Sequence, residues 1–434
     1  MKRLLIVSPV FPPLNSPDMQ RVRMSLPYYR ENGWEPIVLT VAPDLQDTAR
    51  DDELTATVPN DIAVHRCGAL PLGLSRKFGL GNLGLRAWWH LLFAGGRLLC
   101  REKTELVLLS NTQFLTFLLG RIWRKWYGVP YVIDLQDPWR TTYYEQPGSR
   151  KPPGGWKYTF ARLQARLFEP WAFRKMSGFI SVSPKYITDL EARYPWFSRI
   201  PSATIPFGAS ELDLAHALAK AAPSSPPKNA VRLVYTGAAG PITPDAANLL
   251  FQAFSKFKAA HPQHASRLRF EFHGTSYAPV AVACPAVSDY AEKHGVADHV
   301  CENPARIGHL DALRLQANAD GLLLLGSIDP AYSPSKLYNY FLAQRPMLGL
   351  AAKGSVLEAL LTELSCSFLV TFNGRGAEDE AIDSLQRFFS DAVAGFPRGS
   401  QPARNETVFR EKYLARRLTS AQCALFERAL AKSH

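Results

Sequence analysis

The stretch YSPSKLYNYFLAQRP, residues 332–346, carries residue types that bind phosphate. Ser333 suits the N-cap of a helix, and Ser335 and Lys336 follow with free amides. The apolar run GLLLLGS at 321–327 predicts a buried strand just ahead of this helix. A helix N-terminus with an ammonium group beside it, at the carboxyl end of a parallel strand, favours an anion. The alternative is an ordinary helix cap with Lys336 in solvent.

A second candidate is the motif DLQDPWR, which places Asp134 and Asp137 three residues apart at the end of the strand PYVID. A carboxylate there can orient an attacking hydroxyl or accept its proton, which is general-base chemistry. Asp137 precedes a proline and is expected in an extended conformation. Of the two, Asp137 is the preferred candidate. The alternative is that Asp137 caps the following turn and Asp134 bonds to the backbone.

Other strand ends carry glycine and one arginine. Gly237 and Gly240 follow the apolar run VRLVYT, and Gly274 follows LRFEFH, as a close approach of the backbone to a ligand requires. Arg306 lies in the loop ENPARIGH. Together with the Ser-Lys pair above, these features predict a nucleotide site in the second half of the chain.

The first strand leads into PVFPPLNSPDMQRVR, which places Arg21 and Arg23 near a helix start. There they would meet a phosphate or an acceptor. This loop has no glycine, so it lacks the backbone cradle of glycine-rich phosphate loops.

These residues need a scaffold, and strands alternating with helices predict it. The expected fold class is α/β, with two doubly wound, Rossmann-like domains facing a central cleft where ligands bind. We expect a first domain over 1–220, a linker over 221–230, a second domain over 231–402, and a helix over 403–434 that reaches back to the first domain. The predicted strands are 3–9, 36–41, 62–66, 105–110, 130–134, 178–183, 231–237, 268–274, a short one near His299, and 321–327. The predicted helices are 19–32, 83–101, 112–127, 156–177, 245–260, 286–295 and 309–319.

Length and composition agree with this scaffold. A chain of 434 residues fits two domains of about 200 residues, and 47% hydrophobic with 20% charged residues is typical of a globular protein. The six cysteines form no C-x-x-C pair, which argues against zinc and fits a reducing cytoplasm. The apolar run that begins with MKRLLIV ends at Pro9 and is followed by no cleavage site, so we expect no signal peptide. The apolar segment 87–100 is too short to span a bilayer.

The net charge of +12 is concentrated in the first half, where residues 1–205 hold 27 Lys or Arg against 17 Asp or Glu. Aromatic residues are interleaved with these charges in 121–128 and in 156–176. Such a surface suits anionic lipid, because Trp and Tyr favour the membrane interface and Lys and Arg favour its negative potential. An ordinary basic face of packing helices is the alternative. Nucleic acid is disfavoured, because no known binding module accompanies the charge.

Taken together, the motifs resemble those of GT-B fold glycosyltransferases, in particular the family 4 group, which is retaining and uses nucleotide sugars. The resemblance covers nearly the whole chain and is carried by FPP with Arg21, DLQDPW, the VSP at 182–184, IPFGASELD, YTG and above all PSKLYNYFLAQRP. It implies transfer of a sugar from a nucleotide diphosphate sugar to a hydroxyl acceptor, with no metal or other cofactor.

The chain departs from this family in the last motif, which often holds two glutamates separated by seven residues, one near the donor sugar and one on the ribose. Ala331 and Asn339 occupy these positions here, and Asn339 can still bond a ribose hydroxyl. The family's frequent Arg-Lys pair after the first strand of the second domain is also missing. That leaves Arg306 and Lys336 to neutralise the diphosphate.

The resemblance and the basic first half together predict a cytoplasmic enzyme, at the inner face of the membrane, that uses a lipid-linked or glycan acceptor in surface polysaccharide or glycolipid assembly. Two alternatives stay open: a nucleotide-sugar epimerase of the same fold, and a non-catalytic nucleotide-binding protein. The predicted site comprises Asp137 and Asp134 as catalytic candidates, Arg21 and Arg23 on the acceptor side, and Gly237, Gly274, Arg306, Ser335, Lys336 and Asn339 at the donor.

Overall fold

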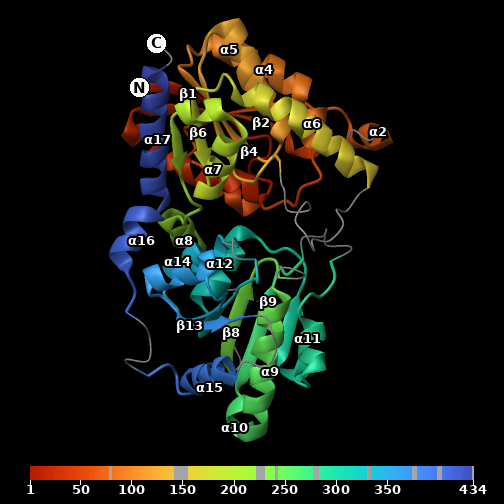
Figure 1. Ribbon diagram of the computed structural model, residues 1–434, viewed down its shortest axis with the longest axis vertical. Helices are drawn as coiled ribbons and strands as arrows, with labels where there is room; N and C mark the ends of the chain where they lie inside the picture. The colour runs from red at the N-terminus through yellow and green to blue at the C-terminus, as the bar shows by residue number, and fades with distance from the viewer. Residues whose placement is uncertain are drawn as a thin grey trace. The chain divides into compact units, whose positions relative to one another are not determined.

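The computed structural model divides into two compact units (Figure 1). The first unit comprises Met1–Phe207 and Ala415–His434, and the second comprises Gly208–Leu414. The structure describes residues 1–77, 81–140, 155–220, 230–239, 243–276, 283–329, 332, 334–373, 379–397 and 403–432.

The first unit is built on a parallel sheet of seven strands. They are β1 (Lys2–Val7), β2 (Trp34–Val41), β3 (Ala63–Cys67), β4 (Leu106–Asn111), β5 (Tyr131–Leu135), β6 (Gly178–Ser181) and β7 (Ser202–Thr204). Their order is β3-β2-β1-β4-β5-β6-β7, and every residue of β4 and β5 is buried because helices cover both faces. The order reverses between β1 and β4, and in such sheets ligands bind at the carboxyl ends of the strands near this switch point.

Two sets of helices cover the sheet of the first unit. They are α1 (Gln20–Ser25), α2 (Leu72–Lys77), α3 (Leu83–Arg86), α4 (Trp88–Arg101), α5 (Phe117–Tyr127), α6 (Trp156–Phe173), α7 (Pro184–Arg193) and α17 (Ala415–Ala431). On one face, α4, α5 and α6 share a core with Val7, Val107 and Ile133. On the other face, α1 and α17 share a core with Leu4 and Ile6. Alternate residues along a strand therefore pack into two separate cores, one on each face of the sheet.

The last helix, α17, completes the first unit. Figure 1 shows it in blue beside β1, from the other end of the chain, and β6, from the middle of the chain. The Phe426 ring is fully buried and meets the Trp34 ring edge-on, with centroids 5.4 Å apart. Gln422 Nε2 donates to Ser25 Oγ, and Tyr29 Oη donates to Gln422 Oε1, both at 2.9 Å. The first unit is therefore discontinuous in sequence.

The second unit is built on a parallel sheet of six strands. They are β8 (Val231–Thr236), β9 (Leu268–His273), β10 (Val300–Asn303), β11 (Gly321–Leu325), β12 (Met347–Ala352) and β13 (Phe368–Phe372). Their order is β10-β9-β8-β11-β12-β13, with the switch point between β8 and β11. The helices of this unit are α8 (Glu211–Leu218), α9 (Pro244–Ala260), α10 (Pro262–Ala265), α11 (Ser288–Lys293), α12 (His309–Ala317), α13 (Lys336–Ala343), α14 (Val356–Leu364), α15 (Asp379–Val393) and α16 (Glu406–Lys412).

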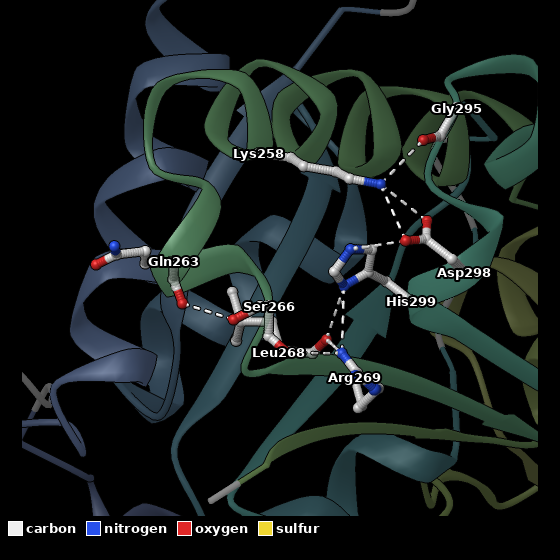
Figure 2. A network of polar contacts seen from close by, with 8 residues as sticks. All are labelled: Lys258, Gln263, Ser266, Leu268, Arg269, Gly295, Asp298 and His299. Atoms are coloured by element: carbon white, nitrogen blue, oxygen red, sulfur yellow. Dashed lines mark hydrogen bonds and ion pairs between the residues drawn. The ribbon is translucent and has the colours of Figure 1, made fainter.

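A polar network holds the amino edge of this second sheet (Figure 2). Lys258 Nζ of α9 donates to Asp298 Oδ1 at 2.9 Å and to Gly295 O at 3.4 Å. The buried His299 ring lies beside Asp298, and its Nδ1 is 3.1 Å from Leu268 O. Because β9 begins at Leu268 and β10 begins just after His299, the network fixes the starts of both strands and leaves the opposite edge for ligands.

The predicted alternation of strands and helices is confirmed in both units. All of β11 is buried, and α13 ends at Ala343, just before Arg345 and the following proline. The predicted helix over 19–32 is shorter: α1 gives way to 3-10 turns at Leu26–Tyr28 and Arg30–Asn32. A proline at residue 27 explains the change, because it removes a donor from the helical ladder.

The boundary between the units lies earlier than the predicted residue 220. Helix α8 belongs to the second unit because Ala217 packs in one cluster with Leu310 and Leu313 of α12. The segment predicted as one helix over 403–434 is two, with α16 in the second unit and α17 in the first. Of the predicted linker, residues 221–229 lie outside the described residues.

Candidate functional site

In the second unit, glycine backbone lines the carboxyl edge of the sheet. Gly237 follows β8 with φ +96° and Gly274 follows β9 with φ +73°, a left-handed conformation that favours glycine. Gly237 N donates to His273 O at 2.7 Å, and Gly274 N donates to Asn303 O at 2.8 Å. A Cβ added to Gly274 would lie 3.8 Å from Gly237 N. The structure therefore brings the two predicted glycines together next to the switch point.

Lys336 reaches the same point from the far side of the switch. Its Nζ donates to Tyr235 Oη at 2.5 Å and to Ala238 O at 3.3 Å, and lies 3.7 Å from the centre of the Tyr235 ring. A Cβ added to Gly237 would lie 3.4 Å from this Nζ. Although the side chain as a whole is half-buried, desolvation of its ammonium end lowers the pKa of Lys336 to about 7. A poorly solvated cation beside bare backbone is well placed to meet an anion.

The start of α13 carries two more predicted residues. Ser335 is exposed and immediately precedes the helix, and Asn339 lies one turn beyond Lys336 and is half-buried. The helix is tied to the end of β8 by Tyr340, whose buried Oη accepts a hydrogen bond from Thr236 N at 2.8 Å. This bond holds the middle of α13 at the switch point.

The loop after β10 brings the predicted arginine to the same edge. Arg306 is exposed, and its neighbour Ile307 packs against Gly274, where an added Cβ would lie 3.8 Å from Ile307 N. The structure thus places the Arg306 loop beside the glycine backbone. Gly240, Ala331 and Ser333 lie outside the described residues.

In the first unit, Asp134 and Arg21 form a buried ion pair at the end of β5. Arg21 Nε lies 3.0 Å from Asp134 Oδ2, and Ser110 Oγ donates to the same oxygen at 2.6 Å. Burial raises the pKa of Asp134, and the charge of Arg21 and the Ser110 hydrogen bond oppose that rise. Arg21 also donates to Ile205 O at 2.7 Å. These contacts brace the ends of the strands and leave both side chains without exposure to an acceptor.

Arg23 also lies inside the protein. Its side chain is 1% exposed, its Nη1 donates to Thr57 Oγ1 at 2.7 Å, and its Nε donates to Gln20 Oε1 at 2.9 Å. We expected Arg23 near an acceptor because it follows the first strand closely. The helix instead turns this residue inward, so it does not face a ligand.

Asp137 is the predicted carboxylate that reaches the surface. It lies in the loop just after β5, and its side chain is exposed. Nearby protein atoms still desolvate it and raise its pKa, and the negative charge of Asp18 adds to the rise. Asp18 is buried, and its Oδ2 accepts a hydrogen bond from Thr112 Oγ1 at 3.1 Å. Two carboxylates therefore lie near one another at the carboxyl edge, and Asp137 is the one open to a substrate.

Solved structures of low identity share this fold along its whole length. An α,α-trehalose-phosphate synthase (UDP-forming) from Burkholderia vietnamiensis has a TM-score of 0.60 at 11% identity, covering 98% of this chain and 96% of that chain. A glycosyltransferase from Rickettsia africae has a TM-score of 0.58 at 12% identity, covering 99% and 98%. A sucrose-phosphate synthase from Thermosynechococcus elongatus has a TM-score of 0.56 at 11% identity, covering 100% of both chains. The GT-B fold class predicted from the motifs is therefore confirmed.

A sequence match covers most of the first unit. Residues 20–208 match the family described as "Glycosyl transferase 4-like domain". The first unit is therefore similar to glycosyltransferases of the family 4 type. No curated protein sequence matches the chain. The predicted resemblance to the family 4 group is confirmed.

Sequence reasoning missed three residues of this candidate site. Tyr235 bonds the Lys336 amine, the charge of Asp18 helps to raise the pKa of Asp137, and the Glu302 carboxylate accepts hydrogen bonds from Ala286 N and Ser288 N. The sequence signal for Tyr235 was its place in the YTG motif, of which only the glycine was considered as a binding residue. Asp18 and Glu302 carry no local signal, because their partners are distant in sequence.

Within the described ranges, no three or more His, Cys, Asp or Glu side chains are grouped to hold a metal ion. In the same part of the chain, no helix has the length and hydrophobicity to cross a bilayer.

Proposed function

We propose that this protein is a glycosyltransferase that moves a sugar, with retention, from a uridine-type nucleotide diphosphate sugar bound by the second unit to a hydroxyl acceptor presented at the first. The observation that carries the proposal is the Lys336 amine, held over Gly237 at the switch point between β8 and β11. Uridine is the proposed base because one structural relative is described as UDP-forming.

Lys336 and Arg306 have the charge to stabilise the leaving diphosphate. As the bond to the anomeric carbon breaks, negative charge grows on the phosphate oxygens, and cations already in place lower the energy of that state. The positive end of α13, beginning beside Ser335, acts in the same sense. Asn339, one turn along, has an amide that can bond a ribose hydroxyl.

The acceptor step needs little from the protein beyond position. The acceptor oxygen attacks the face that the diphosphate leaves, the bond from the anomeric carbon to the phosphate oxygen breaks, and the leaving phosphate takes the acceptor proton. Asp137 then orients the acceptor hydroxyl as a carboxylate. Asp134 and Arg21 support this loop from beneath, through their buried ion pair.

We further propose that side-chain cations, and no metal cofactor, balance the diphosphate charge. Activity should then be unchanged when the enzyme is assayed in a metal chelator. The acceptor is proposed to be a lipid-linked or glycan hydroxyl of surface polysaccharide or glycolipid assembly, met at the inner face of an anionic membrane. The basic, aromatic character of the first unit supports this acceptor class.

The first test is nucleotide binding. Thermal unfolding is measured with UDP, GDP, ADP and dTDP, and a ligand at about 100 times its Kd adds roughly 2.7 kcal/mol, or about 5–11 °C for a unit of about 200 residues. We expect UDP to stabilise the protein, and Lys336→Ala to remove that response. The exposed Lys353→Ala of the same unit is the matched control. No response to any nucleotide would overturn the donor site.

The second test is turnover, followed as release of UDP from a UDP-sugar with and without an acceptor. Asp137→Asn should lower kcat by up to about 10²-fold through misplacement of the acceptor hydroxyl, while the donor KM changes little. Release of an epimerised sugar without acceptor would identify an epimerase instead. UDP binding with no turnover on any lipid or glycan hydroxyl would identify a binding protein.

A further inference from the structure

One face of the first unit exposes an unusual number of large apolar side chains. The helices α4, α5 and α6 pack side by side over the same face of the sheet (Figure 1). Trp123 Nε1 of α5 donates to Leu92 O of α4 at 3.1 Å, and Arg121 Nη1 of α5 donates to Trp171 O of α6 at 2.6 Å. We call their outer surface the α4–α6 face. Its exposed apolar residues are Trp89, Phe93, Trp126, Tyr127, Phe160, Leu163, Leu167, Phe168 and Trp171.

Helix α6 shows the pattern most clearly. Phe160, Leu163, Leu167 and Trp171 recur at spacings of three, four and four residues, so they form one stripe along the helix. They are 61%, 54%, 60% and 38% exposed. The side of α6 toward the sheet already packs through the small Ala165 and other buried residues. The stripe is therefore an additional apolar surface, not the packing face of the helix.

The charged residues of these three helices are almost all basic. The three helices hold Lys or Arg at eight positions, and Glu169 is their one acidic residue. Glu169 is 1% exposed and is paired with Arg193 Nη1 at 2.7 Å, so it does not offset the surface charge. A second copy of the same face would bring like charges together. An anionic surface with an apolar layer beneath it matches both features.

The topology of the sheet brings one end of the α4–α6 face to the carboxyl edge of the sheet. All three helices run from the carboxyl edge of the sheet to its amino edge, because each connects or precedes parallel strands. Trp89 and Phe93 of α4 and Phe160 of α6 thus lie in the helix halves nearest the edge that carries Asp137. Arg101 lies at the other end.

We propose that the α4–α6 face docks on an anionic lipid bilayer, with its aromatic and leucine side chains in the interface and its Lys and Arg side chains among the headgroups. Docking holds the carboxyl edge of the first unit near lipid-borne hydroxyls. The choice of acceptor rests on the proposed function; the docking itself does not.

The test is sedimentation of the full chain with vesicles of pure phosphatidylglycerol or pure phosphatidylcholine. We expect binding to phosphatidylglycerol alone, weakened by salt. The variant Phe160→Ser/Leu163→Ser/Leu167→Ser should lose at least about tenfold in partitioning. The matched control is Leu212→Ser/Leu218→Ser/Val356→Ser in the second unit, where the wild-type side chains are 42%, 53% and 45% exposed, and it should bind like wild type.

Three outcomes would overturn the proposal: no binding to anionic vesicles, unchanged binding of the triple α6 variant, or self-association that this variant relieves without any vesicle binding. If the triple variant does not fold, the charge variant Arg97→Glu/Arg101→Glu/Lys125→Glu takes its place, with the same expected loss. Both variants should keep the thermal response to UDP. Failure of docking is thus distinguishable from failure of the donor site, which would abolish that response in every variant.

Discussion

The Nζ atom of Lys336 lies against the ring of Tyr235, and its protonation depends on what else is bound there. Without an anion its pKa is about 7, so at pH 8 most molecules hold a neutral amine. A diphosphate favours the ammonium form and raises that pKa. Binding above pH 7 therefore takes up a proton, and affinity falls as pH rises.

We expect the affinity for UDP to fall between about pH 7.5 and 9, a range in which the nucleotide charge is constant because its last phosphate pKa is near 6. Titration calorimetry in two buffers of different ionisation enthalpy measures the proton uptake. Lys336→Arg stays charged throughout this range and should bind without the slope. A slope that persists in the arginine variant would place the titrating group elsewhere.

Alanine substitutions at Asp134 and Asp137 should have very different effects on the free energy of unfolding. Asp134→Ala leaves Arg21 buried without its counter-ion and should lower the free energy of unfolding by about 3–5 kcal/mol. Asp137→Ala removes an exposed side chain and should change it by less than about 0.5 kcal/mol. Tryptophan fluorescence in urea measures this in the first unit alone, because all nine tryptophans lie between residues 34 and 196. Equal losses in the two variants would contradict the structural role of Asp134.

The sequence could not separate these two aspartates, because both stand at the end of one apolar run. Asp134 belongs to β5, where its side chain meets Arg21 and Ser110, which are far away in the chain. Asp137 lies past the strand end, where the chain turns to the surface. The motif identified the loop, but burial is set by long-range contacts that local patterns do not contain. The glycine and lysine residues were easier, since strand ends predict their shared edge.

At the scale of elements, Glu302 on β10 organises the segment that leads into α11. Its carboxylate accepts hydrogen bonds from Thr275 Oγ1 at 2.5 Å, Ala286 N at 2.7 Å, Val287 N at 3.1 Å, and Ser288 N and Oγ at 2.8 and 2.7 Å. Burial alone would raise the pKa of Glu302, but these bonds outweigh burial and lower it. The carboxylate is thus held as an anion beside the Gly274 loop.

Glu302→Gln should lower the free energy of unfolding of the second unit by about 1–3 kcal/mol, because an amide NH2 cannot accept these bonds. Amide hydrogen exchange at Val287 and Ser288 should become faster. In the wild-type protein the contribution is present above the ordinary glutamate pKa of 4.5 and is lost as pH falls through the lowered value. Glu358→Gln, at a carboxylate that accepts from Gly354 N, is the control and should leave these two amides unchanged. Unchanged amide exchange at Val287 and Ser288 in Glu302→Gln would show that the Glu302 carboxylate does not hold this segment.

The elements that were predicted well are those with strong local signals. The run at 321–327 gave β11, and the apolar stretch after residue 3 gave β1, because strands covered on both faces must be apolar throughout. By contrast, β7 is a three-residue edge strand of Ser, Ala and Thr, half-exposed, with no apolar run to mark it. Its pairing with β6 supplies what its own sequence lacks.

At the scale of the whole molecule, the first unit depends on the end of the chain. Burial of Leu418, Leu425 and Phe426 of α17 contributes about 5–9 kcal/mol, which is comparable to the net stability of a domain. A protein of residues 1–207 should therefore show no cooperative unfolding by tryptophan fluorescence. Added peptide 415–432 should restore it, whereas a peptide with Leu425→Ser and Phe426→Ser should not. Cooperative unfolding of residues 1–207 at the midpoint of the full chain would disprove this dependence.

The boundary between the units could not be predicted from composition. The stretch rich in Pro and Ser at 221–230 marks a linker by composition, but the contacts divide the chain at Phe207, before α8. What assigns α8 to the second unit is its packing on α12, about 90 residues later in the chain. Only the three-dimensional structure contains that information.

The chain passes from the first unit to the second near residue 207 and returns to the first near residue 415. This path also fixes the order in which the protein can fold during its synthesis. A ribosome adds about 5–20 residues per second, so the roughly 200 residues of the second unit take about 10–40 s to make. During that interval the sheet face that includes Leu4 and Ile6 lacks the cover that α17 later provides. The nascent chain therefore displays an apolar sheet to the chaperones that attend the ribosome, and the unit whose strands emerge first is the last to be completed.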